Sequence, residues 1–344
     1  MSRVAAADGS PTWDGSGWQN VGQAAGGPTT RGEMTSATPG DPIIRVLDIH
    51  KVYGEVRAVD GLSFEVRRGE VFGLLGPNGA GKTTTIEMLE GLRKPDSGRL
   101  EVLGIDAVAD PDALKERIGV TLQTAELYPK LTVTEVLELF RSFYLRTVPT
   151  DRLIDFLDLG ERRHALTREL SGGQRQRLAV ALALVNDPEV VFLDEPTTGL
   201  DPAARRSLWD LVEQLRDQGK TILLTTHYME EADHLCDRLA IMDHGRILEH
   251  GSPRELIDRR FHERAVRFDS RPELPVERLR DLAAVETVKT DDGTTFLYTR
   301  DVPATVGALL ALTDEVGVDP GNLDVRRATL EDVFLELTGR ALRD

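Results

Sequence analysis

The sequence predicts an α/β domain with a largely parallel sheet, followed by a smaller α+β domain. Two continuous apolar runs, "EVVFLDEP" and "KTILLTTH", are typical of strands buried on both faces of a parallel sheet. Such strand patterns alternate with helical patterns, which favours an α/β architecture. After "HGSPRELI" the elements follow a different order, which indicates that a second domain begins beyond this point.

The first segment, residues 1–41, is rich in Gly, Ala, Ser, Thr and Pro and lacks aliphatic periodicity. Such a segment cannot bury enough apolar surface to offset the entropy lost on ordering, so we predict a disordered leader. Trp13 and Trp18 within it could form a docking motif, although stray aromatic residues are the simpler interpretation. No basic segment precedes an apolar core, so a secretory signal is not expected.

The first folded domain is predicted to cover residues 42–254. "IIRVLDIHKVY" and "LSFEVRRGEVFGLLG" are β-rich runs, the second of which ends at Gly76. A helix is predicted from Lys82 to about Leu92, a strand in "SGRLEVLG", and helices near Pro111–Arg117 and Val133–Tyr144.

The second domain is predicted over residues 262–344 and has the order β-α-β-β-α-β. This is the split βαβ, or ferredoxin-like, arrangement. A final helix begins at Thr329, where "TLED" resembles a capping box. The preceding elements are two helices, Val276–Leu282 and Pro303–Val316, and four strands, Ala265–Asp269, Glu286–Lys289, Thr295–Tyr298 and Asn322–Arg326.

Composition excludes several classes of function. The 344 residues carry a formal net charge of −16, so we expect no nucleic-acid partner. Cys236 is the single cysteine, which rules out an intrachain disulfide. The longest apolar run, Leu178 to Val185, is too short to span a bilayer. Any action at a membrane must therefore go through a partner.

A complete phosphate-loop motif, "GPNGAGKT", stands between a predicted strand and a predicted helix. Its glycines allow several N–H groups to converge on a phosphate chain at a helix N-terminus. Lys82 can reach the β- and γ-phosphates, and the Thr83 hydroxyl can ligate Mg²⁺. The alternative is a simple glycine-rich turn. The predicted phosphate-binding residues are Gly76, Pro77, Asn78, Gly79, Ala80, Gly81, Lys82, Thr83 and Thr84.

Two carboxylates end the buried run "VVFLDEP". Asp194 is placed to hold Mg²⁺ through water. Glu195 cannot serve as a phosphate ligand because like charges repel, but it can polarise an attacking water as a general base. The alternative is an ordinary acidic junction between a strand and a loop.

A further helix is predicted in "LSGGQRQRLAVALALV", and its first residues are unusual for a helix. Ser171 and Gln174 have capping-box spacing, so a well-capped helix would explain them. A cap does not call for Gly172 and Gly173, because glycine weakens the first turn of a helix. Glycine at these positions is useful if a ligand must approach the backbone closely.

Together, "LSGGQ" and "LDEPTTGLD" resemble the signature of ABC-type ATPases, over about Ile43 to Gly251. The resemblance implies a P-loop NTPase domain with a mixed sheet, a helical subdomain at about 125–185, and ATP and Mg²⁺ as cofactors. In that family the signature of one subunit closes over the ATP held by the other. This implies that 171–174 complete a partner's site, with Ser171 and Gly173 on the γ-phosphate, in a homodimer or with a paired ATPase subunit.

The resemblance also implies roles for four single positions. Tyr53 matches the aromatic residue that stacks on adenine, although strand packing would be the simpler explanation. Gln123 matches the glutamine that senses Mg²⁺ and the attacking water at the surface facing a membrane partner. Asp201 matches the residue that communicates across the dimer, and His227 the histidine that contacts the γ-phosphate.

A rival interpretation of His227 is a metal site. His227, Glu230, Glu231 and His234 would share a helical face and could bind a metal ion. However, His227 directly follows a β-rich run, which places it before the helix.

The C-terminal stretch "TLEDVFLELTGR" resembles that of daunorubicin-resistance-type ATPases. This implies a subunit that powers export of drugs, lipids or other hydrophobic compounds through a separate membrane-spanning permease, peripherally bound at the cytoplasmic face of the membrane. One alternative is a soluble ABC-type ATPase in ribosome or DNA maintenance. The absence of coiled-coil heptads and the presence of a single cassette argue against it. Another is a regulatory protein without turnover, which intact Lys82, Asp194, Glu195 and His227 argue against.

Overall fold

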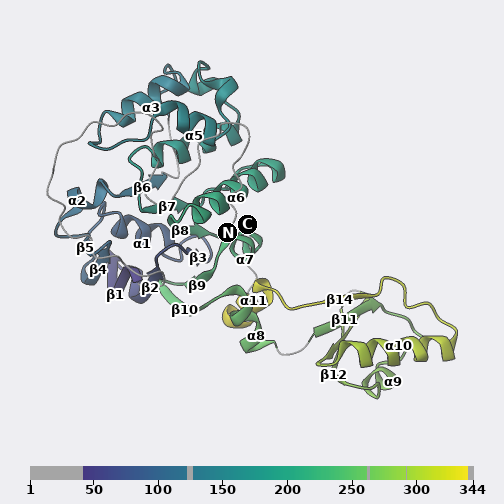
Figure 1. Cartoon of the computed structure of the whole chain (residues 1–344). Helices are drawn as coiled ribbons and strands as arrows, with labels where there is room; N and C mark the ends of the chain where they lie inside the picture. Colours follow the sequence, from purple (N-terminus) through teal and green to yellow (C-terminus); the bar gives the residue numbers. More distant parts are fainter. Residues whose placement is uncertain (1–41, 122–126, 262–263, 292, 340–344) are drawn as a thin grey trace, which may run out of the picture. The chain divides into compact units, whose positions relative to one another are not determined.

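The computed structural model describes residues 42–121, 127–261, 264–291 and 293–339, and groups the chain into two compact units (Figure 1). One unit extends to His250 and the other starts at Gly251. The predicted leader and Gln123 lie outside the described residues.

The first unit is built around a six-stranded sheet with the order β10-β9-β3-β8-β7-β6. β3 pairs in parallel with β8 and β9, and β7 pairs in parallel with β6 and β8. Every residue of β3, β7 and β8 is buried, which confirms the predicted buried strands. The strands are β3 Val71–Leu75, β6 Ile118–Thr121, β7 Val190–Asp194, β8 Thr221–Thr226, β9 Arg238–Asp243 and β10 Arg246–Gly251.

A second sheet is antiparallel, with the order β2-β1-β4-β5, which agrees with the mixed architecture that the resemblance implied. A two-residue connection, Gly54 and Glu55, joins β1 to β2, and so short a loop permits only antiparallel pairing. Along the end of β2, buried and exposed residues alternate, so one face of the strand stays at the surface. The strands are β1 Pro42–Tyr53, β2 Val56–Arg67, β4 Ser97–Val102 and β5 Ile105–Asp106.

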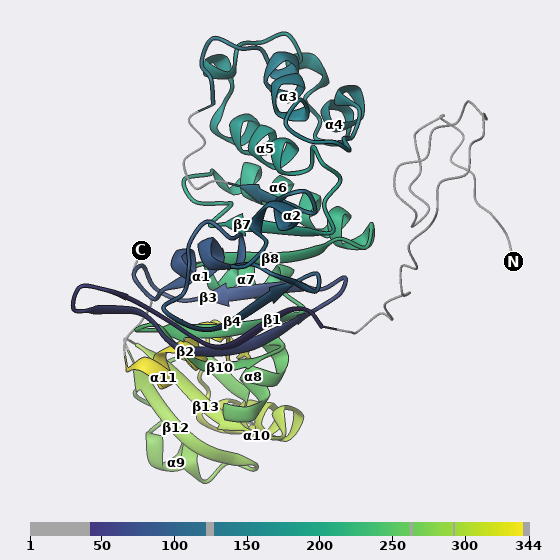
Figure 2. The same ribbon diagram turned by 90° about the vertical axis from the view of Figure 1, so that its left-hand side faces the viewer.

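Helix α1 supplies Ile86, Met88 and Leu89 to a core shared by both sheets. Helices α3 and α5 gather at the β6 end of the parallel sheet, away from the antiparallel sheet, in both views (Figures 1 and 2), and Figure 2 shows α4 beside them. Among the described helices, none combines the length and the apolar composition needed to cross a bilayer. The helices are α1 Lys82–Leu89, α2 Pro111–Lys115, α3 Val133–Arg141, α4 Thr150–Phe156, α5 Gly172–Ala183, α6 Pro202–Asp217 and α7 Met229–Leu235, with 3₁₀ turns at Gly160–Arg162 and Thr167–Glu169.

The second unit has an antiparallel sheet of order β12-β13-β11-β14, which confirms the predicted split βαβ order. Leu279 of α9 and Leu309 of α10 pack on Val266 and Phe268 of β11. The elements are α8 Pro253–Arg260, β11 Arg264–Asp269, α9 Val276–Arg280, β12 Val285–Asp291, β13 Thr294–Thr299, α10 Val302–Val316, β14 Asp324–Arg326 and α11 Leu330–Thr338.

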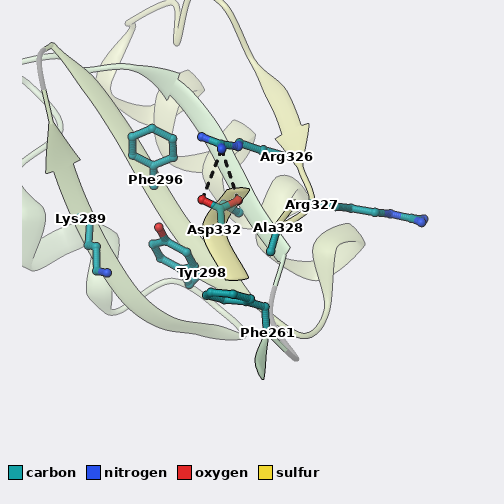
Figure 3. Close-up of a pocket in the computed structure, with 9 residues that line it drawn as sticks. Phe261, Lys289, Phe296, Tyr298, Arg326, Arg327, Ala328 and Asp332 are labelled. Carbon is teal, nitrogen blue, oxygen red and sulfur yellow. Dashed lines mark hydrogen bonds and ion pairs between the residues drawn. The ribbon is translucent and has the colours of Figure 1, made fainter. Parts of the chain in front are cut away.

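A pocket of about 220 Å³ lies within the second unit (Figure 3). The half-buried rings of Phe296 and Tyr298 line it, because they alternate along β13 with the core residue Leu297. Lys289 Nζ stands 5.3 Å from the centroid of the Tyr298 ring, and an Arg326–Asp332 ion pair borders the pocket.

Candidate nucleotide site

The phosphate loop joins β3 to α1 in a conformation that requires glycine. Gly81 has φ +98°, and a Cβ there would lie 2.2 Å from the Ala58 carbonyl oxygen. Gly79 has φ +82°, but no atom lies within 4 Å of where its Cβ would be, so its outer side is open. The first N–H groups of α1 have no partner within the helix. The loop therefore ends at a helix N-terminus that can bind an anion.

Lys82 is almost fully buried, at 4% exposed, at the start of α1. Its ammonium donates to the carbonyl oxygens of Gly76 at 2.7 Å and Pro77 at 3.1 Å. It also forms an ion pair of 3.2 Å with Oε1 of Glu195. Burial lowers the pKa of Lys82, and the Glu195 carboxylate opposes that shift. The ammonium is thus held inside the loop by oxygen atoms of this chain.

Asp194 ends β7 beside two hydroxyl groups. The Thr83 hydroxyl donates to Oδ1 of Asp194 at 3.4 Å, and the Thr225 hydroxyl donates to the same oxygen. The backbone N–H of Glu195 in turn donates to the Thr225 hydroxyl at 2.9 Å. Burial raises the pKa of Asp194, against the Thr225 and Thr83 hydroxyls, which lower it. A hydroxyl and a carboxylate are oxygen ligands of the kind Mg²⁺ prefers.

Glu195 and His227 face each other across the ends of β7 and β8. Glu195 has φ +46°, a left-handed conformation that is uncommon outside glycine. Nδ1 of His227 lies 3.3 Å from Oε2 of Glu195, although it is not aligned for a hydrogen bond. Burial favours a raised pKa for Glu195, but Lys82 and then His227 outweigh it, and the net pKa is lowered. The Glu195 carboxyl is therefore ionised beside the phosphate loop.

Tyr53 lies at the end of β1, in the antiparallel sheet. Its side chain is 40% exposed. Lys51 Nζ and Arg93 Cζ stand 5.7 Å and 5.4 Å from the ring centroid. The ring is accessible rather than packed in a core.

The predicted capping box of α5 is present. The Ser171 hydroxyl accepts from the Gln174 N–H at 3.2 Å, and the Gln174 side chain accepts from the Ser171 N–H at 3.0 Å. A Cβ on Gly173 would lie 3.0 Å from Cβ of Ala204, so close packing on α6 accounts for this glycine. Gly172 is open, with its nearest neighbour at 4.0 Å. Both views place α5 apart from α1, so one chain does not bring the signature to its own phosphate loop (Figures 1 and 2).

Asp201 caps the N-terminus of α6 by accepting from the N–H groups of Ala203 and Ala204 at 2.9 Å each. Ala204 is also the residue that Gly173 packs against. The two motifs that the resemblance assigned to a dimer contact therefore meet at the start of α6.

Comparison with known proteins adds an independent line of evidence. The family model described as "ABC transporter" matches residues 59–198. A Nod factor export ATP-binding protein I from Ralstonia nicotianae is 45% identical over 309 residues, which cover 88% of this chain and 96% of that protein. The chain belongs to the ABC transporter family. It is an ATP-binding subunit, and it hydrolyses ATP.

Other ABC proteins are also similar to this chain. The daunorubicin/doxorubicin resistance ATP-binding protein of Streptomyces peucetius is 40% identical, over 86% of this chain and 92% of that protein. A dimeric bacterial ABC transporter cassette of solved structure superposes with a TM-score of 0.55 and 28% identity, covering 61% of this chain and 98% of that chain. This chain thus shares the cassette fold of a solved ABC protein.

The rival metal site of this ABC subunit is not formed. Within the described ranges, no three His, Cys, Asp or Glu side chains lie together in a way that could hold a metal ion. His227 precedes α7, Glu230 is exposed, and Glu231 is buried against Trp209 instead. Thr225 was not predicted from the sequence. Its only signal there was its place at the end of a strand, beside the predicted histidine.

Proposed function

We propose that the chain powers export of drugs, lipids or other hydrophobic compounds through a membrane-spanning permease on a separate chain. Relatives named for Nod factor export and for daunorubicin/doxorubicin resistance support the proposal, because they align over 88% and 86% of this chain and not over the ATPase core alone. The names of the same relatives argue against the alternative of an ATPase in ribosome or DNA maintenance.

Two nucleotide sites form at the interface of two subunits, with this chain as a homodimer or paired with another ATPase subunit. The separation of the signature from the phosphate loop within one chain is the observation that carries this proposal (Figure 1). Ser171, Gly172, Gly173 and Gln174 close over the ATP of the partner, and the solved dimeric cassette supports this arrangement. Asp201 lies at the same interface, and adenine stacks on the accessible ring of Tyr53.

Within each site, residues 76–84 hold the phosphates and the His227 side chain contacts the γ-phosphate. The Glu195 carboxylate accepts a proton from the attacking water, for which its ionised state suits it. Thr83 and Asp194, with Gln123, would hold Mg²⁺, which neutralises charge on the phosphates. Electrostatic stabilisation and positioning then provide most of the rate enhancement.

The permease docks on the helical segment near Gln123, at the cytoplasmic face of the membrane. Tyr128, Phe143 and Leu145 support this placement, because their side chains are 55%, 64% and 93% exposed. Exposed apolar side chains mark a surface that binds other proteins when they form one contiguous patch, as the proposal expects of these three.

The substitution Glu195→Gln tests the composite site, which is the proposed nucleotide site formed by two subunits. Removing the base should lower kcat by about 100-fold or more while ATP still binds, because the amide keeps the size of the side chain. The variant should form a stable dimer with saturating MgATP, as measured by size-exclusion chromatography with light scattering.

Glu230→Gln is the matched control, since Glu230 is exposed and stands outside the site. It should hydrolyse ATP normally and show no trapped dimer. A Glu195→Gln variant that stays monomeric with ATP, both alone and with its permease, would contradict the composite site. Identification of the membrane protein that co-purifies with the tagged chain tests the transport proposal separately.

A further inference from the structure

The sheet of the second unit has helices α9 and α10 on one face and the pocket on the other (Figure 3). Phe296 and Tyr298 of β13 belong to the pocket face, because they alternate with Leu297, which packs in the core. Both aromatic side chains are only half-buried. Aromatic rings gain most when further apolar surface packs on them, so these two rings can still take a ligand.

Cross-strand pairing explains why a pocket forms on this face. Ala265 of β11 stands directly opposite Tyr298 on one side and opposite Arg326 of β14 on the other. Its side chain ends at Cβ, so it forms a low floor between two long side chains, and it is 7% exposed. A cavity of about 150 Å³ is enough to hold benzene, so the pocket of about 220 Å³ has room for a small fused ring system.

The walls of the pocket suit a flat, unsaturated ligand. Because a strand rises about 3.4 Å per residue, the rings of Phe296 and Tyr298 start about 7 Å apart on the same face. Phe261 lines the same pocket with a third ring. Such walls accept another ring system in offset-stacked or edge-to-face contact.

The carboxylate that lines the pocket is already engaged. Asp332 accepts from the N–H and the hydroxyl of Thr329 at 2.8 Å and 3.0 Å, which caps the N-terminus of α11. It also pairs with the Arg326 guanidinium at 3.3 Å. The charges of Asp332 and Arg326 therefore compensate each other.

Lys289 of β12 supplies positive charge that this ion pair leaves uncompensated. It stands opposite Phe296 in the sheet, and its ammonium lies 5.3 Å from the centroid of the Tyr298 ring. Among the side chains that the structure describes, no carboxylate forms an ion pair with this exposed lysine. In a chain of net charge −16, the pocket thus combines aromatic walls with one available cation.

We propose that the pocket binds a planar aromatic carboxylate, whose rings pack on Phe296 and Tyr298 and whose negative group meets the Lys289 ammonium. A single available cation matches a single negative charge better than the two charges of a phosphate monoester. The pocket shares no residue with the nucleotide site, because all its lining residues belong to the second unit. The inference therefore does not depend on the roles proposed for the nucleotide site.

The probe is 2-naphthoate, which is added to the full chain and followed by isothermal titration calorimetry. Saturable binding with a Kd of about 0.1 mM or below is expected. Two matched compounds separate the contributions. The neutral 2-naphthalenemethanol keeps the rings without the charge, and cyclohexanecarboxylate keeps the charge without the aromatic rings. Each should bind about fivefold or more weakly than 2-naphthoate.

Lys289→Gln tests the charge. Because Lys289 is exposed, the variant should fold normally. Its Kd for 2-naphthoate should rise about fivefold, while its Kd for 2-naphthalenemethanol should stay within about twofold. Arg327→Gln is the matched control, since it also removes one positive charge but the Arg327 side chain points away from the pocket in Figure 3. It should keep both affinities.

Ala265→Leu tests the space. Leucine occupies the floor of the pocket and leaves every aromatic ring and charge in place, so the Kd for 2-naphthoate should rise more than about tenfold. The Tm should stay the same or rise, because the added methyl groups are buried in existing space.

The simpler explanation is that the rings and Lys289 only stabilise the sheet through cross-strand contacts. The absence of saturable 2-naphthoate binding up to about 1 mM would favour that explanation and overturn the inference. A folded Ala265→Leu variant with wild-type affinity would also overturn it, as would equal losses in Lys289→Gln and Arg327→Gln. Saturating MgATP should leave the Kd within about twofold, and competition by MgATP would contradict the inference by moving the ligand to the nucleotide site.

Discussion

At the scale of single residues, three carboxyl groups of the first unit have pKa values shifted in different ways because their neighbours differ. Lys82 and His227 lower the pKa of Glu195, whereas burial raises that of Asp194. Glu90, the C-cap of α1, is 4% exposed. Burial, followed by the charges of Asp194 and Glu87, raises its pKa to about 8. Glu90 is therefore neutral in the folded protein at pH 7.

This state of Glu90 makes stability depend on pH. The unfolded chain releases the Glu90 proton near the ordinary pKa of 4.5, whereas the folded protein keeps it up to about pH 8. The folded state binds more protons in this window, so the contribution of Glu90 to stability is present below about pH 4.5 and is lost as pH rises towards 8. Glu90→Gln should remove that loss of stability at high pH.

We predict that Glu90→Gln raises the Tm of the first unit by several degrees at pH 8.5, and by much less at pH 5. Thermal unfolding at the two pH values measures the difference. The exposed Glu161 provides the control, since Glu161→Gln should shift the Tm equally little at both. A Glu90→Gln effect that is the same at both pH values would show that Glu90 is charged in the folded protein.

At the scale of elements, the N-terminus of α5 has a structural cap and a proposed contact with the partner's γ-phosphate. Ser171→Ala should cost about 1 kcal/mol through the lost cap. Ser171→Asp should keep the cap, because aspartate is an equally good N-cap, but it places a negative charge where the phosphate would stand.

We therefore predict that Ser171→Asp keeps the Tm of the wild type within about 2 °C yet loses ATP-dependent dimerisation and nearly all hydrolysis. The Ser171→Ala variant should be less stable and partly active. Thermal unfolding and a phosphate-release assay separate the two effects. Normal turnover by Ser171→Asp would mean that α5 acts as a capped helix only.

How far the sequence predicts these elements depends on how local the deciding interactions are. The phosphate loop, the capping box of Ser171 and the buried runs of β7 and β8 follow from neighbouring residues, so pattern and spacing suffice. The antiparallel sheet and the hydrogen bonds of Thr225 and Glu231 depend on partners 22 to 31 residues away or more. No periodicity in a strand or helix reports such partners, which only the folded chain brings together.

At the scale of the whole molecule, residues 1–41 remain a predicted leader, and the limits 42–254 and 262–344 remain predicted domain bounds. The structure groups α8 with the second unit. We predict that deleting residues 1–39 leaves kcat within about twofold of the full chain, because a segment of this composition cannot form a packed core. Steady-state ATPase assays of both forms measure this. A collapse in activity would show that the leader packs on the cassette.

The interactions of Lys82 have a consequence for how the protein exchanges ligands. Its ammonium already donates to two carbonyl oxygens and is paired with the Glu195 carboxylate. On the proposed role of Lys82, an incoming triphosphate displaces these internal ligands, and a product that has lost its terminal phosphate meets the same competitors with less charge of its own. The internal ligands then favour departure of the spent nucleotide, and Glu195 stays paired with Lys82 until fresh substrate draws the lysine away.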